Sequence, residues 1–480
     1  MKSRHAWLLL LTLSLGLLLR LYPLDAESIW YDEAYTIRVA HLGFWDVIAD
    51  CSKDVHPPAY LLLMRYWVHV FGDSVYSVRF PSVIFGLLSV YMAYRVGGSF
   101  FSGETGVLAS AIMAVSLIHV RYSQDARMYP LLVLLTLLSM YFFHRTLILG
   151  KKGPDAAAYV LSTTLLVYTH NYGLFIPLAQ DVFFMAMLFI RRQEYSARVR
   201  LWLITQSCVA LLYAPWLPSL YFQAFQGHAA DWLIGYHGPP GIATILDTLV
   251  DWSGDSVLLL LFTALTYLAI KKARGAESSP SLLLLIMWLA VPLAASSIIS
   301  HAFKPIYFVK FTMLASPALY LMASEGLRGI GSARMKHALL ALILLLSLVE
   351  LSYYYAYDLN EPWNRAVHYI DENAGPRELV LLDAPWIKNV GVFSYYSQRD
   401  DLQLKVYDAK EMNALGRKNQ QIWAVFRRDY YRASIDGRLR RLYPKVSCTD
   451  FTKTYFREVG NLYVRPDETD TGLTVCLYSR

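Results

Sequence analysis

The chain has 480 residues, of which 56% are hydrophobic and 17% are charged. Soluble domains average roughly 45–50% apolar and 25% charged residues. The composition therefore excludes an ordinary soluble protein, and long apolar runs between residues 6 and 355 predict a polytopic membrane protein. The formal net charge of +7 lies largely between those runs, which indicates membrane topology rather than nucleic-acid binding.

Eleven apolar stretches are predicted to cross the membrane, with the N-terminus inside and the residues after 355 outside. The orientation follows from basic clusters, which are all assigned to the cytoplasmic side and must be separated by even numbers of crossings. The clusters lie at residues 2–4, 151–152, 191–200, 271–274 and 328–336. The predicted crossings are 6–24, 78–97, 104–121, 130–149, 156–169, 172–190, 200–220, 254–270, 280–299, 306–326 and 337–355.

One apolar stretch, residues 57–71, is left out of these crossings. It is 15 residues long, below the roughly 20 needed to span a bilayer. Counting it would also put the later basic clusters on the wrong side. We therefore expect a helix that lies in the outer interface, preceded by a second interfacial helix over residues 33–50, where apolar residues recur at helical spacing.

Two adjacent carboxylates, Asp32 and Glu33, follow the first apolar segment. Carboxylates beside hydrocarbon are energetically unfavourable, which makes them candidates for function as a base or as metal ligands. Alternatively, they form a solvated loop or the acidic N-terminus of the next helix. The predicted topology places the pair on the outer face of the membrane with other polar residues: His56, Asp125, His170 and Lys304.

After residue 355 the composition changes to a small α/β domain outside the membrane. Helices are predicted at 363–373 and 388–397, and strands at 378–383, 404–407, 421–426, 461–464 and 473–478. The four cysteines show no metal-ligand spacing. Cys448 and Cys476 both lie in this domain and could pair in an oxidising compartment, although sequence alone does not establish their proximity.

Several outer-loop motifs are similar in type and order to those of a known family of enzymes. Asp32–Glu33 followed by Asp54-Val-His-Pro-Pro58 is similar to the first outer loop of protein O-mannosyltransferases. Later motifs look like those of bacterial relatives in the mannosyltransferase-like and aminoarabinose-transferase-like branch: Ser123-Gln-Asp-Ala-Arg-Met-Tyr129, Tyr168-Thr-His-Asn-Tyr172, Pro305-Ile-Tyr-Phe-Val-Lys-Phe311 and Glu361-Pro-Trp-Asn-Arg365. One departure is Lys310–Phe311, where relatives often have Arg-Tyr.

The resemblance is to GT-C membrane glycosyltransferases, and it implies a GT-C fold with a transmembrane catalytic domain over 1–355 and an extracytoplasmic α/β domain over 356–480. It also implies inverting transfer of a sugar from a polyprenyl-phosphate donor to a lipid, glycan or protein acceptor. The location implied is the cytoplasmic membrane, with the active site on its outer side. A polyprenyl-lipid transporter or flippase is the alternative, but transporters place ionisable residues near mid-bilayer and often show repeats. A third alternative is an assembly partner of other envelope proteins.

Inverting transfer needs a base near the acceptor, and Asp32 is the candidate. Glu33 could orient the acceptor or bind a cation, and Asp125 could hold the acceptor or the donor sugar, or share a metal. The structural alternatives are a helix cap for Asp32 and a local ion pair of Asp125 with Arg121 or Arg127.

The candidates for the donor are cationic, imidazole and aromatic side chains. Positive charge near the departing phosphate would come from Arg127, Lys304 and Lys310, unless these residues anchor the chain at the interface. His56 and His170 could donate to phosphate, bind a divalent ion (Zn, Mg or Mn) together with Glu33, or serve as structural donors. Tyr129, Tyr172 and Tyr307 could stack on a sugar or belong to the interfacial aromatic belt. Residues 221–253 could form a lid over the site or a passive connection.

Overall fold

The computed structural model describes residues 2–226, 239–273, 279–356, 360–382, 391–407, 420–427, 432–452 and 472–479. The chain divides into two compact units. The first, here called the helical unit, comprises Met1–Tyr22, Leu42–Val70 and Arg79–Ser352. The second, here called the C-terminal unit, comprises Pro23–His41, Phe71–Val78 and Tyr353–Arg480. The C-terminal unit thus takes in two early segments that the sequence assigned to the transmembrane domain.

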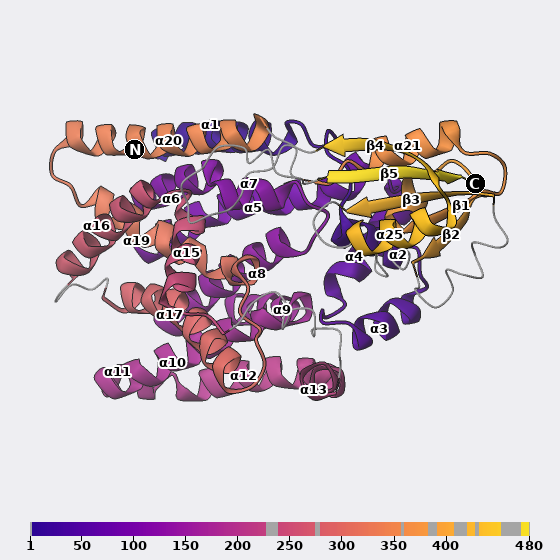
Figure 1. Ribbon diagram of the computed structural model, residues 1–480. Coiled ribbons are helices and arrows are strands. Elements are labelled where there is room, and N and C mark those ends of the chain that lie inside the picture. Colours follow the sequence, from indigo (N-terminus) through magenta and orange to yellow (C-terminus); the bar gives the residue numbers. More distant parts are fainter. Residues whose placement is uncertain are drawn as a thin grey trace. The chain divides into compact units, whose positions relative to one another are not determined.

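The helical unit is built from long helices that run along a common direction (Figure 1). Helix α8 packs on α9, α16 on α19, and α10 on α17. The first half of its elements is α1 Lys2–Leu21, α3 Phe44–Lys53, α4 Ala59–Phe71, α5 Val75–Phe100, α6 Gly103–Val115, α7 Leu117–Ser123, α8 Tyr129–Phe143, η1 His144–Ile148, α9 Pro154–Thr169, η2 Asn171–Leu174 and α10 Phe175–Ile190. The second half is α11 Arg192–Ser196, α12 Val199–Tyr213, η3 Ala214–Trp216, α13 Leu217–Phe225, α15 Ile242–Ser253, α16 Ser256–Ala273, α17 Ser279–Ala302, α18 Val309–Thr312, η4 Met313–Ala315, α19 Ser316–Arg328 and α20 Ala333–Ala356.

Among the described residues, eight helices are long and apolar enough to cross a membrane, and the bent pair α6–α7 would make a ninth crossing. Two of the eleven predicted crossings lie outside this set. The stretch 156–169 corresponds to α9, which has 16 residues, and 306–326 is divided among α18, η4 and α19. Eleven crossings therefore remain a prediction.

The first predicted outer loop is helical but differs in detail from the prediction. Within the stretch 57–71, Ala59–Phe71 form the 13-residue helix α4, which does not belong to the candidate spans. The single helix predicted over 33–50 is wrong, because two helices, α2 (Tyr31–Ala40) and α3, are separated there, with Gly43 as the N-cap of α3. The described part of the predicted loop 221–253 contains the end of α13 and all of α15, and its residues 227–238 lie outside the described residues.

A buried arginine joins α1 to the break between α6 and α7, where the chain bends by 61° at Ser116. The guanidinium of Arg20 is fully buried and donates to the carbonyl oxygens of Ala114 at 2.9 Å and Met113 at 3.4 Å. These carbonyls lie at the C-terminal end of α6, where helix geometry leaves acceptors without an intrahelical donor. Arg20 therefore caps the broken helix from a distant segment.

A second contact joins the same two helices, with its donor just after α7 and its acceptors at the end of α1. The Nε2 amide of Gln124, just after α7, donates to the carbonyl oxygens of Tyr22 at 2.7 Å and Arg20 at 3.2 Å, at the C-terminal end of α1. Arg20 also donates to the hydroxyl of Ser123 at 3.1 Å. Gly86 lies against this contact, and a Cβ there would come within 2.1 Å of the Ser123 hydroxyl. We call Arg20, Ser123 and Gln124 the α1–α7 clamp.

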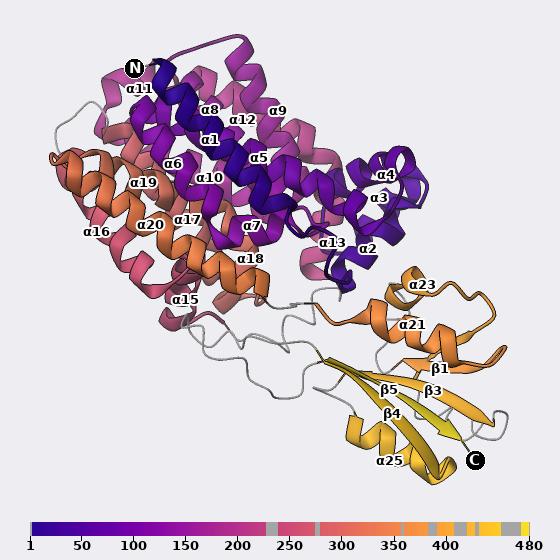
Figure 2. The same ribbon diagram turned by 90° about the horizontal axis from the view of Figure 1, so that it is seen from above.

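The C-terminal unit contains a sheet whose described strands follow the order β2-β1-β3-β5-β4. Strand β1 is parallel to β2 and β3, whereas β5 is antiparallel to β3 and β4. Helix α25 packs on one face, where Ile435 and Leu439 contact strand residues, and α21 lies on the other side of the sheet (Figure 2). The elements are α2, α21 Trp363–Asn373, β1 Leu379–Leu382, α23 Val392–Tyr396, β2 Gln403–Val406, β3 Gln421–Arg427, α25 Arg432–Leu442, β4 Lys445–Thr452 and β5 Gly472–Ser479.

Most of the predicted elements of this domain are found. Helix α21 has the predicted bounds, and β1, β2, β3 and β5 begin and end within one or two residues of the prediction. Helix α25 and strand β4 were not predicted, and the strand predicted at 461–464 lies outside the described residues. Cys448 and Cys476 occupy directly opposite positions on β4 and β5 and form a disulfide.

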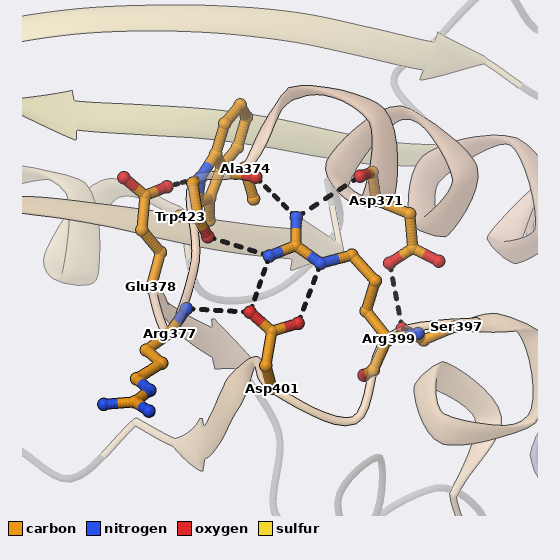
Figure 3. A network of polar contacts seen from close by, with 9 residues as sticks. Asp371, Ala374, Arg377, Glu378, Ser397, Arg399, Asp401 and Trp423 are labelled. Atoms are coloured by element: carbon orange, nitrogen blue, oxygen red, sulfur yellow. Dashed lines mark hydrogen bonds and ion pairs between the residues drawn. The ribbon is translucent and has the colours of Figure 1, made fainter.

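An arginine connects the loops that precede β1 and β2 (Figure 3). The guanidinium of Arg399 donates to the carbonyl oxygens of Ala374 and Gly375, after the end of α21, and to both carboxylate oxygens of Asp401. Asp401 also accepts from the backbone N–H of Arg377, which has a φ of 59°. The hydrogen bond from Arg399 holds the pKa of Asp401 well below its usual range. The network therefore fixes the turn that leads into β1.

Candidate active site

The paired carboxylates lie in the first turn of α2, within the C-terminal unit, and their environments differ. Glu33 is fully buried, and its Oε2 accepts from the backbone N–H of Trp30 at 3.3 Å. It thereby caps the N-terminus of its own helix. Asp32 is partly exposed on the same turn. A carboxylate with access to solvent suits a base, whereas the carboxylate of Glu33 holds the helix in place.

The helical unit contains a cluster of rings around Phe311. The ring centroid of Phe311 lies 4.8 Å from that of His170 and 5.4 Å from that of Tyr172. The rings of His56 and His170 are 5.0 Å apart, and Tyr129 stacks on Phe311 at 6.2 Å. These residues come from separate loops and helix starts. The fold therefore brings together four of the predicted site residues, and we call these five side chains the histidine cluster.

Two positive charges flank this cluster. The Nζ atom of Lys310 lies 5.7 Å from the ring centre of Tyr129 and 5.0 Å from that of Phe308. Arg127 is 3% exposed and lines a small pocket whose other lining residues are His56, Pro57, Tyr60, Leu61, Met128 and Thr169. A buried guanidinium at the pocket, with the partly buried ammonium group of Lys310 beside the same cluster, forms an environment that favours an anion.

Both histidines of the cluster are neutral. Burial is the main cause that lowers the pKa of His56 well below its usual range, and the charges of Arg127 and Lys310 add to it. The pKa of His170 is lowered for the same reasons. The Nδ1 atom of His170 accepts from the backbone N–H of Tyr172 at 3.0 Å. Because that nitrogen is an acceptor, the proton of the neutral ring is on Nε2.

This tautomer bears on the predicted metal site. The Nε2–H of His170 and the Nδ1 of His56 are buried and have no hydrogen-bond partner within the described residues. His170 offers a proton at Nε2 rather than the lone pair that a metal needs. Within the described part of the chain, no three His, Cys, Asp or Glu side chains gather as metal ligands. The donor set suits an anion better, and a metal bound by Glu33, His56 and His170 remains a prediction.

Three further predicted residues lie outside the histidine cluster or at its margin. Asp125 is partly exposed between Gln124 of the clamp and Arg127 of the pocket, and its carbonyl oxygen accepts from the backbone N–H of Arg127 at 2.8 Å. The clamp therefore positions the Asp125–Arg127 turn. The hydroxyl of Tyr307 is hydrogen-bonded to that of Thr248 at 2.8 Å, which joins it to α15. Lys304 follows α17, and its role at a phosphate remains a prediction.

The neutral histidines make the stability of the protein sensitive to acid. Their folded pKa values lie below the unfolded value of about 6.5, so the unfolded chain binds more protons below that pH. The contribution of these two histidines to the free energy of unfolding is therefore constant well above pH 6.5 and falls below that pH, by at most about 1.4 kcal/mol per pH unit for each histidine. In the double variant His56→Gln/His170→Gln, the thermal midpoint in detergent should fall less between pH 7.5 and 5.5 than in the wild type. An unchanged difference would contradict this assignment.

The sequence prediction missed residues that position the site. Arg20 is a single charge within the first apolar stretch, and such a charge marks a functional or structural role. Gln124 lies inside a motif that was singled out for Asp125 and Arg127, and Phe311 was noted only as a departure from relatives. The isolated charge of Arg20 in an apolar stretch could have been recognised from the sequence. The contacts of Gln124 and Phe311 could not, because their partners lie far away in the chain.

Comparison with known proteins agrees with the motifs. Residues 55–218 match the family model described as dolichyl-phosphate-mannose-protein mannosyltransferase, which confirms the resemblance. The matched stretch contains most of the histidine cluster and both residues of the Asp125–Arg127 turn. No curated protein matches the chain in a sequence search.

Similar solved structures cover most of the chain. ArnT from Cupriavidus metallidurans in the apo state is 12% identical, with a TM-score of 0.64 over 99% of this chain and 98% of that chain. The same ArnT bound to undecaprenyl phosphate is 11% identical, with a TM-score of 0.62 over 97% of each chain. The Archaeoglobus fulgidus oligosaccharyltransferase in complex with Zn and sulfate is 12% identical, with a TM-score of 0.57 over 87% of this chain and 67% of that chain. At these identities the likeness shows the fold, which is ArnT-like.

Proposed function

We propose that this chain, whose residues 55–218 match the dolichyl-phosphate-mannose-protein mannosyltransferase family, is an inverting glycosyltransferase of the cytoplasmic membrane. It takes a sugar from a polyprenyl-phosphate donor and transfers it to a lipid, glycan or protein acceptor on the outer side. An ArnT of similar fold is seen with undecaprenyl phosphate, which supports a lipid phosphate as the carrier.

The observation that carries this proposal is the set of donors in and around the histidine cluster, where Arg127 lines the small pocket beside His56 and Lys310 lies over the ring of Tyr129. Arg127 and Lys310 supply positive charge, and His170 supplies a neutral N–H donor. A departing lipid phosphate gains negative charge as its bond to the sugar breaks. Preorganised cations and donors stabilise that charge without reorganisation. A protein that bound only the apolar chain of a lipid would not need cations and N–H donors at this position.

The reaction is a direct displacement at the anomeric carbon. The acceptor oxygen forms a bond to that carbon while the bond to the phosphate oxygen breaks, and the polyprenyl phosphate leaves with the electron pair. The proton of the acceptor hydroxyl passes to the carboxylate of Asp32. Attack from the face opposite the leaving group inverts the configuration. Arg127 and Lys310 hold the leaving phosphate, and the backbone cap by Glu33 keeps α2 formed.

Two experiments test the function. Mass spectrometry of envelope lipids, glycans and proteins from cells with and without the gene should reveal one glycoform that depends on it. The purified protein should then release polyprenyl phosphate from the matching lipid-linked sugar. Movement of the lipid-linked sugar across vesicles without any sugar transfer would instead support the transporter alternative.

The phosphate site has its own test. Lys310→Ala should lower kcat/KM for the donor about 10- to 100-fold, the value of a charge-assisted hydrogen bond of about 1.5–3 kcal/mol, because the charge that it stabilises develops as the phosphate departs. Lys310→Arg should recover most of the loss, because it keeps the charge. Lys445→Ala removes an exposed charge at the start of β4 and serves as the control. Equal kinetics for Lys310→Ala and Lys445→Ala would refute the assignment of the phosphate site.

A further inference from the structure

The segment that leads into α2 is held by the C-terminal unit at consecutive polar groups. The hydroxyl of Ser28 donates to Oδ1 of Asn364 at 2.7 Å and accepts from the backbone N–H of Asn364 at 3.2 Å. The carbonyl oxygen of Ser28 accepts from the side-chain amide of Asn360 at 2.9 Å. The backbone N–H of Ile29 donates to the hydroxyl of Tyr396 at 2.7 Å. Four hydrogen bonds thus tie two residues of this segment to the start of α21 and to α23.

These four hydrogen bonds are partly buried: the groups on this segment are buried, whereas Asn364 is exposed. Ser28 is 5% exposed and Ile29 is fully buried. Leaving a buried donor without its partner lowers stability by about 1–3 kcal/mol, which is more than a hydrogen bond contributes to stability on average. The Ile29 N–H therefore depends on Tyr396, and the segment has little freedom to shift. Asp32 lies three residues after Ile29, in the first turn of the helix that this segment starts.

The other end of α2 is held through the neighbouring tyrosine. The hydroxyl of Tyr395 donates to the carbonyl oxygen of Asp73 at 2.9 Å. The carboxylate of Asp73 contacts Nε2 of His41, the C-cap of α2, at 3.0 Å. Adjacent residues of α23 thus reach both ends of α2, Tyr396 directly and Tyr395 through Asp73.

We infer that α21 and α23 of the C-terminal unit position the carboxylate of Asp32 for proton transfer, with Asn364 and Tyr396 as positioning residues. The inference rests on the proposed function, because it assumes that Asp32 is the base. On this inference the C-terminal unit contributes to the rate of sugar transfer, because it holds the segment that carries the base. A misplacement of about 1 Å at a reacting group is enough to lower a rate about 100-fold.

The test uses the full-length protein in detergent or nanodiscs. Tyr396→Phe removes only the hydroxyl that receives the Ile29 N–H, and Asn364→Ala removes the acceptor for Ser28. Both should lower kcat about 10- to 100-fold with an unchanged KM for the donor, and Asn364→Asp, which keeps the Oδ1 acceptor, should restore most of the rate. Tyr369→Phe removes a hydroxyl that Thr449 contacts within the same unit and is the matched control.

A comparison in the background of Asp32→Asn separates positioning from general damage. If Tyr396 acts through Asp32, Tyr396→Phe lowers kcat in the wild type but hardly changes the residual rate of the Asp32→Asn variant. An equal fold-loss in both backgrounds would overturn the inference.

Amide hydrogen exchange tests the anchoring of this segment without a measurement of activity. Tyr396→Phe should speed amide exchange over residues 28–33, while Tyr369→Phe should not. Faster exchange in a protein that transfers no sugar would refute the proposed function but leave the anchoring contact established. Unchanged exchange together with an unchanged kcat would refute the positioning role.

Discussion

Replacing Asp32 by Asn is expected to lower kcat for sugar transfer about 10²- to 10⁴-fold, the contribution of a positioned general base. The amide has nearly the same shape as the carboxylate, so α2 should keep its fold, and the KM for the donor should change little. The amide cannot accept the proton of the acceptor hydroxyl. Single-turnover kinetics with the lipid-linked donor measure this loss directly, because they separate chemistry from product release.

Glu33→Gln is the matched comparison, since the neighbouring carboxylate caps the helix rather than facing solvent. This variant should retain most of the kcat and most of the stability, because the side-chain amide oxygen of glutamine can still accept the hydrogen bond from the backbone N–H of Trp30. If Glu33→Gln abolished transfer while Asp32→Asn retained it, the roles of the two carboxylates would have to be exchanged. Full transfer by Asp32→Asn would remove Asp32 from the role of base.

Replacing Arg20 by Ala is expected to lower the free energy of unfolding by about 3–5 kcal/mol. The variant leaves buried carbonyl oxygens of α6 without their donor and opens a cavity where the side chain was. Arg20→Lys should lie between the variant and the wild type, because a single ammonium group cannot reach all the acceptors that the planar guanidinium serves. Thermal unfolding in detergent, followed by near-UV circular dichroism, measures both differences.

Arg95→Ala is the control for this prediction. Arg95 is exposed on α5 and donates to the hydroxyl groups of Tyr91 and Tyr141. Its removal should change stability by less than about 1 kcal/mol, as is usual for surface substitutions. If Arg20→Ala unfolded at the same temperature as Arg95→Ala, the α1–α7 clamp would not stabilise the break between α6 and α7.

The clamp also connects stability to the active site. Gln124 of the clamp immediately precedes Asp125, and Arg127 of the same turn lines the pocket beside His56. A folded Arg20→Lys variant should therefore also show weaker donor binding. The effect would reach the pocket through the backbone of α7 and not through direct contact with the donor.

Local patterns in the sequence carry much of the architecture. Helix α21 was predicted with its observed bounds because Trp363, Ala366, Val367 and Ile370 repeat at helical spacing and are all buried. Strands β1 and β3 were found because short apolar runs between polar loops are typical of buried strands. Helix α25 was missed because its sequence is strongly basic and contains Gly437, which weakens the helical signal.

The sequence by itself determined that the chain has the composition of a membrane protein, that its outer-loop motifs resemble those of GT-C enzymes in order, and which side chains are candidates for the proposed reaction. Only the tertiary structure decided that Glu33 caps α2, that His170 presents a proton at Nε2, and that His56 and His170 lie side by side. It also decided which distant residues hold the site: Arg20 reaches Ala114 across 94 residues, and Tyr396 reaches Ile29 across 367. Local periodicity reports which face of an element is buried, but it contains no information about which distant donor meets a given acceptor, because that depends on packing of the whole unit.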